Sequence, residues 1–470
     1  MTETINSSLQ SYFGTPEGIF RFKVPSDEQN GEARFFRFGA DTQLYGRVAA
    51  ETNPSVNGAL HDYIEDADKS CDASLPFNPL EVAANLRTER YPLEGEKKGL
   101  MQEVVRLAYY TLRPLLPVGV RKYAQRRALR GWERLSFPNW PVERSVDRLF
   151  ERLLMLRLKE HPDEAIPFIW FWPEGKQGCV LMTHDVETAA GLDACDALMS
   201  LNEKYGIRSS FQLIPGGRYH VQPHHIEGMR LRGFEVNIHD WNHDGSLFKE
   251  RQTFAERATK INATAKKWNT VGFRSAALYR NVDWLRELDF EYDMSIPSCA
   301  RLDPQRGGCC TLMPWFNGDL LEIPVTTIQD YSLFHILDRL DIEIWETQTK
   351  RILGHHGMAT FIVHPDYIQT AETEQTYSQL LAYLAEQQSE AGAWIALPQE
   401  VNQWWRQRKQ MRLELDIDGW HVTGPGSERA VVAFARLVNN DIDYTFGTPQ
   451  QIEPYSKSAK TASIRSGIHA

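Results

Sequence analysis

The chain has 470 residues, of which 42% are hydrophobic, so it is long enough for two or three domains with a large buried core. Its formal net charge of −10 argues against a general nucleic-acid binder, because such proteins are usually strongly basic. No stretch approaches the ~18 consecutive apolar residues of a membrane span, and residues 1–8 lack the basic start and apolar core of a signal peptide. We therefore expect a cytoplasmic chain without a transmembrane segment.

Short aromatic runs fill the first part of the chain. Residues 18–24 and 35–38 alternate apolar and polar side chains, a pattern typical of strands, and polar loops separate them. This predicts a small β-rich module over residues 1–95. The pattern then becomes helical, with apolar residues at helical spacing in 141–154, so we expect residues 96–164 to form a helical connector.

A basic segment interrupts this connector. Residues 101–134 contain eight Arg or Lys and only two Glu, and residues 113–130 mix cationic with apolar side chains. Such a segment can rest on an anionic membrane surface, so peripheral membrane contact or a lipid-linked saccharide substrate is one interpretation. Prolines interrupt the pattern, and the alternatives are a solvated helix face or an internal partner for the acidic remainder of the chain.

Strand and helix patterns alternate from residue 165 to 410. Long surface helices are expected at 246–268 and 372–390, and alternating β and α units imply a parallel sheet or barrel. The expected strands are the apolar runs 179–183, 210–214, 234–238, 320–325, 360–363 and 394–397.

The last part of the chain has a different pattern. Apolar and polar residues alternate on both sides of Asp418-Gly419, which is a hairpin turn signal. This predicts a small β module over residues 411–447. The polar tail that follows, residues 448–470, is expected to be disordered.

Two of the expected strands end in residues that can bind a metal ion. Asp185 and Glu187 end the apolar run that begins at Cys179, and His239 and His243 follow the run 234–238. Barrel enzymes keep their chemistry at the carboxyl ends of strands. Glu187, His239 and His243 would provide three ligands, with Asp185 left as a base beside an open coordination position.

Each part of this pattern also has a structural explanation. Histidines four residues apart share one face of any helix, and a carboxylate after a strand often caps the next helix. The two clusters together, each at the end of an expected strand, favour a functional site.

These segments resemble the polysaccharide deacetylase family, which comprises metal-dependent carbohydrate esterases of family four. The separated carboxylate motif is met by Asp185-Val186-Glu187, and the His-x-x-x-His motif by His239 and His243. Arg274 within 272–279 matches the third motif in part, and 360–367 matches the strand that ends in a histidine. The resemblance covers about residues 165–405. It implies an α/β fold with a distorted barrel of about seven parallel strands.

Two residues depart from the family pattern. Glu187 stands where an aspartate is usual, and its extra methylene places the metal farther from the strand or makes the side chain fold back. Ala276 stands where a proline is usual, which loosens the turn that would aim a backbone N–H at the oxyanion. A carboxylate is still a competent ligand and the oxyanion donor is main-chain, so the chemistry survives both changes. The departures also fit a degenerate, inactive relative.

The resemblance implies a metal site and a base. Glu187, His239 and His243 would hold a divalent ion, with Zn²⁺ expected and Co²⁺, Mn²⁺ or Fe²⁺ as alternatives. Asp185 would take a proton from the attacking water. Arg274 would fix this carboxylate and keep its pKa low by its opposite charge.

The resemblance also implies an acid and substrate contacts. His364 would protonate the leaving amine, a task suited to an imidazole that titrates near neutrality, and Asp293 is the candidate to orient it. Trp241 and Tyr279 are the predicted substrate-binding residues. Tryptophans are, however, more often core or interface residues.

The predicted function is removal of an acetyl group from an N- or O-acetylated sugar, inside the cell, during assembly of a cell-surface polysaccharide. One alternative is hydrolysis of another C–N amide bond, in a cyclic ureide or imide, because relatives with those substrates share the separated carboxylate motif. The other is a carbohydrate-binding protein that keeps the barrel but has lost turnover.

Overall fold

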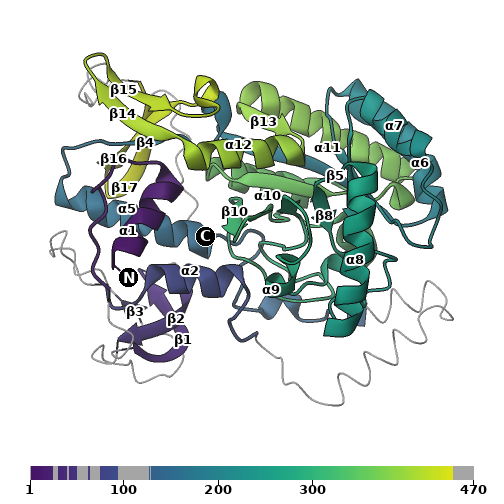
Figure 1. Cartoon of the computed structure of the whole chain (residues 1–470), viewed down its shortest axis with the longest axis horizontal. Helices are drawn as coiled ribbons and strands as arrows, with labels where there is room; N and C mark the ends of the chain where they lie inside the picture. Colours follow the sequence, from purple (N-terminus) through teal and green to yellow (C-terminus); the bar gives the residue numbers. More distant parts are fainter. Residues whose placement is uncertain are drawn as a thin grey trace.

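The computed structural model describes residues 2–24, 30–39, 42–49, 62–63, 75–93, 126–127 and 129–447 (Figure 1). The predicted disordered tail lies outside these residues, as does most of the basic segment 113–130. Within the described ranges, no helix combines the length and the apolar character that a membrane span requires.

The centre of the molecule is a curled, mostly parallel sheet. In the described part of the chain, seven parallel strands are neighbours in the order β12-β5-β6-β7-β8-β9-β11. An eighth parallel strand, β13, pairs with β5, and antiparallel β10 lies beside β11. This confirms the predicted α/β fold with a distorted barrel of about seven parallel strands. The strands are β5 (Gly178–Val186), β6 (Ser210–Leu213), β7 (Glu235–His239), β8 (Gly272–Arg274), β9 (Tyr292–Asp293), β10 (Trp315–Asn317), β11 (Leu320–Glu322), β12 (Met358–Ile362) and β13 (Ala393–Ala396).

Helices cover the outer face of this sheet (Figure 1). The two predicted surface helices are confirmed as α8 (Arg251–Trp268) and α11 (Ala371–Glu390). The other helices of this region are α6 (Ala189–Lys204), α7 (Pro223–Leu231), α9 (Val282–Leu285), α10 (Glu343–Gly354) and α12 (Pro398–Gln410).

The two faces of each strand have different neighbours, because successive side chains point to opposite faces. On β5, Val180 and Met182 belong to the hydrophobic cluster that contains Leu192 of α6 and Leu380 of α11. The side chains of the alternate residues of β5, on either side of Val180 and Met182 in the sequence, point into the curl of the sheet. Polar side chains on this inner face therefore face one another and not the helices.

Hydrogen bonds connect the segment after β11 to β12, so the sheet curls back on itself. Thr326 Oγ1 donates to the carbonyl of Met358 at 2.6 Å, and Thr327 Oγ1 donates to that of Thr360 at 2.8 Å. This connection carries the chain directly to Asp330, beside the end of β12.

The first part of the chain is more helical than its sequence pattern suggests. The predicted strand at 18–24 is wrong: these residues form turns and an extended segment with a bridge at Lys23. The predicted strand at 35–38 is confirmed within β1. The described α-helices and strands before β5 are α1 (Thr2–Phe13), β1 (Asn30–Phe38), β2 (Gln43–Ala49), β3 (Asp62–Tyr63), α2 (Pro79–Arg87), α5 (Ser145–Glu160) and β4 (Ile166–Ile169).

The last strands pack with these early elements. The predicted hairpin at Asp418-Gly419 is confirmed by β14 (Arg412–Asp416) and β15 (Gly419–Thr423). β16 (Val432–Val438) pairs with β17 (Asp441–Phe446) and with β4, so the chain after the barrel shares a sheet with the chain before it.

Arg408 of α12 ties the early and late segments together. Its buried guanidinium donates to the main-chain carbonyls of Tyr12, Phe13, Ile169 and Trp170. One hydrophobic cluster contains residues of α1, α5, β4, α12 and β16. The sequence-based modules thus share a core, and their exact boundaries stay predictions.

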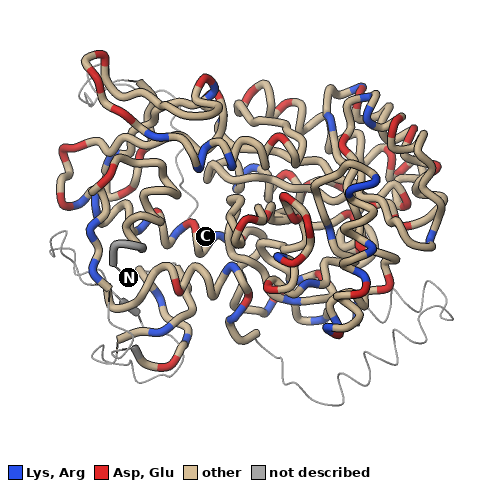
Figure 2. Tube along the Cα trace, viewed as in Figure 1, with Lys and Arg blue, Asp and Glu red and all other residues tan. Residues whose placement is uncertain are grey.

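Charged residues of both signs are interspersed over the described chain (Figure 2). This mixed distribution agrees with the modest net negative charge of the chain. That the chain does not bind nucleic acid stays a prediction.

Candidate metal centre and active site

Parallel strands place their carboxyl ends together, and the inward side chains there form one cluster. Asp185 lies on β5, and His239 of β7 is in register with Arg274 of β8. His364 follows β12, two residues after Ile362, which is in register with Thr183 of β5. The period of two therefore aims all four side chains into the curl of the sheet.

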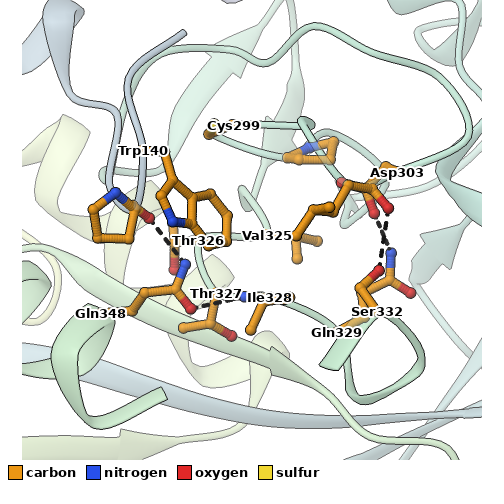
Figure 3. Close-up of a pocket in the computed structure, with 13 residues that line it drawn as sticks. Trp140, Cys299, Asp303, Val325, Thr326, Thr327, Ile328, Gln329, Ser332 and Gln348 are labelled. Carbon is orange, nitrogen blue, oxygen red and sulfur yellow. Dashed lines mark hydrogen bonds between the residues drawn. The ribbon is translucent and has the colours of Figure 1, made fainter. Parts of the chain in front are cut away.

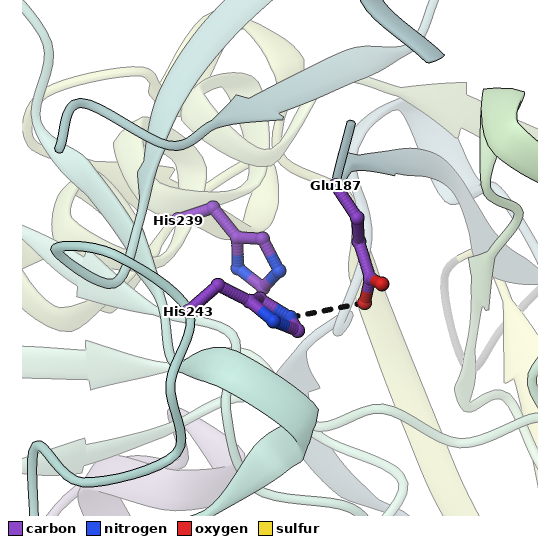
Figure 4. A group of neighbouring side chains, drawn as sticks. All are labelled: Glu187, His239 and His243. Carbon is purple, nitrogen blue, oxygen red and sulfur yellow. Dashed lines mark ion pairs between the residues drawn. The ribbon is translucent and has the colours of Figure 1, made fainter. Parts of the chain in front are cut away.

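The three predicted metal ligands lie together. One ligand atom from each of Glu187, His239 and His243 is within 4.8 Å of the others (Figure 4). His243 Nε2 lies 2.9 Å from Glu187 Oε1, and the two imidazole centroids are 4.8 Å apart.

The ring nitrogens of these histidines fit the role of metal ligands. His239 Nε2 and both ring nitrogens of His243 are buried and have no hydrogen-bond partner among the described residues. The close approach of His243 Nε2 to Glu187 is an ion-pair contact without hydrogen-bond alignment. Buried nitrogens without partners are costly, and a cation between the rings and the carboxylate would satisfy them.

A loop, not a helix, brings the two histidines together. His239 ends β7, and the chain then turns through Asp240 and His243, both in the left-handed region with φ of 56° and 55°. The Asp240 carboxylate accepts hydrogen bonds from the backbone N–H groups of Trp241 and Ala276, at 2.5 and 3.4 Å. The four-residue spacing thus reflects a strained turn, a feature common at functional sites.

Asp185 is held by a buried arginine. Arg274 Nη1 donates to Asp185 Oδ1 at 2.8 Å and to Thr183 Oγ1 at 2.7 Å, and Nε donates to the Met294 carbonyl at 3.0 Å. The carboxylate also lies 3.7 Å from His239 Nε2. Burial alone would raise the pKa of Asp185, but the positive charge of Arg274 keeps this pKa below its ordinary value.

His364 pairs with Asp330, not with Asp293. Its Nδ1 lies 2.6 Å from Asp330 Oδ1, and its backbone N–H donates to Oδ2, also at 2.6 Å. Asp293 instead accepts hydrogen bonds from the Ser295 N–H and hydroxyl. It is in register with Phe273, one position from Arg274, so alternation turns it to the opposite face of the sheet.

The protonation states of the two site histidines differ. Burial lowers the pKa of His239 to about 4, so its ring is neutral at pH 7, as a metal ligand must be. Burial would also lower the pKa of His364, but the charges of Asp330, Glu187 and Asp185 raise it to about 10. The metal-free chain therefore carries His364 as a charged acid, instead of the near-neutral titration expected from sequence.

The turn at Ala276 is ordered without proline. Residues Ala276–Leu278 form a 3₁₀ turn, and the Ser275 N–H donates to Ser295 Oγ at 2.8 Å. Because residue 276 is not proline, it keeps the N–H that binds Asp240. This bond fixes the turn that the missing proline was expected to loosen.

The two predicted substrate-binding residues line the loops around the histidines. The half-buried Trp241 ring packs over Gly216, where an added Cβ would come within 2.7 Å of it, and Lys260 Nζ lies 5.6 Å from its centroid. Tyr279 packs against Gly245 of the loop that carries His243. Whether either residue contacts substrate stays a prediction.

The sequence patterns missed several residues of the site. Asp330 carries no motif, although it follows an apolar stretch. Tyr367 lies beside His364 with ring centroids 4.9 Å apart, and the Tyr331 and His335 rings surround it at 5.7 and 5.0 Å. Tyr331 borders a short π-helical segment, Ser332–Ile336, a conformation frequent at functional sites.

A pocket lies between the connector, which contributes Trp140 and Pro141, and the barrel, which contributes the segment that ends at Gln329 (Figure 3). Gln348 Nε2 donates to the Pro141 carbonyl at 2.9 Å, and Gln329 Nε2 donates to Asp303 Oδ1 at 2.6 Å. Burial raises the pKa of Asp303 to about 6. These bonds tie the wall of the pocket together and support the segment that carries Asp330.

Comparisons with known proteins find matches among solved structures. No family model and no curated protein matches the chain. Among solved structures, a protein assigned as a polysaccharide deacetylase from Mycobacterium smegmatis is 17% identical over 51% of this chain and 93% of its own, with a TM-score of 0.41.

Two other solved structures have similar coverage of this chain. Puue allantoinase is 11% identical over 50% of this chain and 92% of its own, with a TM-score of 0.42. A mutant of a family-four pseudoenzyme with restored enzymatic activity is 16% identical over 49% of this chain and 68% of its own, with a TM-score of 0.32. Each of these three alignments covers about half of this chain.

Proposed function

We propose that this chain is a metal-dependent hydrolase that removes an acetyl group from an N- or O-acetylated sugar. The observation that carries the proposal is the convergence of Glu187, His239 and His243, with two further charged pairs beside them. Those pairs are Asp185 with Arg274 and His364 with Asp330. The arrangement supplies a cation site, a base and an acid within one cluster.

The cation site suits a divalent metal with nitrogen and oxygen ligands. Three protein ligands leave a position open, and Zn²⁺ is the ion we expect, with Co²⁺, Mn²⁺ or Fe²⁺ as alternatives. When bound there, such an ion supplies Lewis acidity, which polarises an acyl carbonyl and lowers the pKa of a water molecule.

Asp185 and His364 divide the proton transfers. Asp185 is unprotonated at neutral pH because Arg274 lowers its pKa, so it can accept a proton from water as the water oxygen bonds to the acyl carbon. His364 is protonated and donates to the sugar nitrogen or oxygen as its bond to the acyl carbon breaks. The products are acetate and the free amine or alcohol.

The acid also indicates where the sugar lies. The atom that His364 protonates belongs to the sugar, so the leaving sugar occupies the side of the site next to this residue. The Tyr367, Tyr331 and His335 rings are there, and aromatic rings stack on the apolar faces of sugars.

The biological setting is proposed from the family resemblance. We propose a cytoplasmic enzyme that acts on a precursor of a cell-surface polysaccharide. A lipid-linked saccharide is one form of such a precursor, with peripheral membrane contact through residues 113–130. Within the described part of that segment, residues 126–127 and 129–130, Arg126 donates to the His335 carbonyl and to Asp338.

Hydrolysis of a cyclic ureide or imide is the second candidate, and the same base, acid and cation site would serve it. A panel of acetylated sugars and small cyclic amides separates the two substrates. An inactive carbohydrate-binding protein is the third candidate, motivated by Glu187 and Ala276. This third candidate predicts that the protein hydrolyses none of the acetylated sugars or cyclic amides in the panel.

The first test is the metal content of the purified chain, measured by elemental analysis after reconstitution. We expect about one equivalent in the wild type and its loss in the double variant His239→Ala, His243→Ala. The variant His220→Ala, His224→Ala is the matched control, because both side chains are exposed histidines outside the cluster. No metal in the wild type would exclude the proposed mechanism.

A further inference from the structure

The main chain of Glu187 is held on both sides by side chains from other loops. Its N–H donates to Asp366 Oδ2 at 3.0 Å, and its carbonyl accepts from Arg218 Nη1 at 3.4 Å. Asp366 follows His364 after β12, and Arg218 lies in the loop between β6 and α7. Two segments far apart in sequence thus fix the peptide groups around one residue.

Each of these side chains also binds a second part of the site. Asp366 Oδ1 accepts a hydrogen bond from the Thr188 hydroxyl, and Arg218 Nη2 donates to the His243 carbonyl at 2.9 Å. Arg218 therefore joins the backbones of two of the three predicted metal ligands.

The surrounding chain is shaped to admit these contacts. Gly191 has no side chain, and a Cβ there would lie 2.2 Å from Asp366 Oδ2. Next to Arg218, the Tyr219 hydroxyl donates to the Val186 carbonyl at 2.7 Å and accepts from the Ile214 N–H at 2.8 Å. The turn after β5 is thus fixed at Val186, Glu187 and Thr188.

We propose that Arg218 and Asp366 are positioning residues that set the place of a glutamate ligand, and so the metal affinity of the site. We refer to them as the Glu187 clamp. A glutamate has one more rotatable bond than an aspartate, so ordering it around an ion costs more conformational entropy. A fixed main chain reduces the number of positions that the Glu187 carboxylate can occupy before it binds the ion. The inference rests on the proposed metal site.

The direction in which Arg218→Ala changes metal affinity distinguishes a positioning role from a purely electrostatic one. A guanidinium near a cation site repels the ion, so electrostatics alone predicts that Arg218→Ala tightens metal binding. The clamp predicts the opposite. Removal of residues that orient metal ligands typically weakens binding by about 10–100-fold, and we expect a loss in that range.

The experiment measures the Zn²⁺ dissociation constant by competition with a chromogenic chelator. The variants are Arg218→Ala and Asp366→Ala. Arg230→Ala is the matched arginine control, since its exposed guanidinium donates to the Trp268 and Asn269 carbonyls far from the site. Asp341→Ala is the matched aspartate control, since it accepts from the Glu343 N–H at 3.1 Å.

We expect weaker binding in both clamp variants and changes of less than about twofold in the controls. The double variant Glu187→Ala, Asp366→Ala should bind no more weakly than Glu187→Ala, because the clamped ligand is already gone. Glu187→Asp should also bind more weakly than the wild type, because the main chain is fixed for the longer side chain. Equal urea midpoints of the metal-free proteins would show that folding is intact.

Three results would overturn the clamp: unchanged or tighter binding in Arg218→Ala, an equal loss in the controls, or an additive loss in the double variant. Each leaves metal binding by the wild type, and hence the proposed function, in place. A wild type that binds no metal would instead remove the proposed function and the clamp together.

Discussion

Arg274 and Asp185 form a buried ion pair, with Nη1 2.8 Å from Oδ1 and side-chain exposures of 0% and 5%. The pair lies on the inner face of the sheet, where the guanidinium also binds Thr183 and the Met294 carbonyl. Burial therefore makes the charge of Asp185 depend on Arg274.

Arg274→Met is predicted to destabilise the protein and to raise the pKa of Asp185. Loss of one partner from a buried pair costs about 3–5 kcal/mol, which urea unfolding would measure. As the proposed base, Asp185 works when deprotonated, so the acidic limb of the pH–rate profile should move to higher pH. Arg257→Met, which removes a partly exposed pair with Asp244, should cost less. An unmoved acidic limb would contradict the role given to Arg274.

Asp330→Asn is predicted to lower the pKa of His364 from about 10 toward the ordinary value of 6.5. The amide cannot supply the negative charge that stabilises the imidazolium. In metal-free protein, NMR titration of the ring would follow this shift. In metal-loaded enzyme, kcat should fall roughly 10²-fold, since general acid catalysis contributes about 10²–10⁴.

Asp293→Asn is the control for Asp330, because the sequence alone assigned the orienting role to Asp293. Its side chain points to the other face of the sheet, so neither the titration of His364 nor kcat should change beyond about twofold. A shift as large as that of Asp330→Asn would reverse the assignment.

His184 is predicted to make the chain sensitive to acid. It lies on the outer face of β5, where its Nδ1 binds the Val363 carbonyl at 2.9 Å and Nε2 faces the Asn202 amide at 3.1 Å. Burial lowers its pKa from 6.5 to about 4. The unfolded chain therefore binds the proton first as pH falls, and stability is lost between pH 6.5 and 4.

That loss should amount to about 3 kcal/mol, since one pKa unit corresponds to about 1.4 kcal/mol. Urea unfolding of the metal-free wild type and His184→Gln between pH 7 and 4 would measure it. The glutamine side chain does not titrate, so between pH 7 and 4 the free energy of unfolding of the variant should fall less than that of the wild type, by about this amount. Parallel curves would show that His184 does not titrate on unfolding.

Trp241→Leu and Tyr367→Leu are each predicted to raise KM by about fivefold with kcat little changed. Loss of a stacking ring costs about 0.5–1.5 kcal/mol of binding free energy. If this loss is equal for the bound substrate and the transition state, it raises KM and leaves kcat unchanged. Trp284→Leu is the control, because this ring packs against Phe254 away from the site. If Trp241→Leu lowered the unfolding temperature without a change in KM, its ring would be a packing residue.

The sequence by itself determined the barrel and the group of side chains that meets at one end of it. Apolar runs of strand length, each followed by a helical pattern, predicted the parallel sheet, and residues at the ends of two runs predicted the ligands Glu187, His239 and His243. The sheet is confirmed and the three side chains lie together, because parallel strands must end together and side chains alternate with a period of two.

The tertiary structure decided the contacts that depend on register and on loops. Strand register turns Asp293 outward, and the segment after β11 brings Asp330 to His364. The clamp residues Arg218 and Asp366 act through main-chain atoms, which leave no motif in the sequence. Hydrogen bonds to backbone carbonyls and N–H groups can be made by many side chains, so only the folded chain reveals which ones make them.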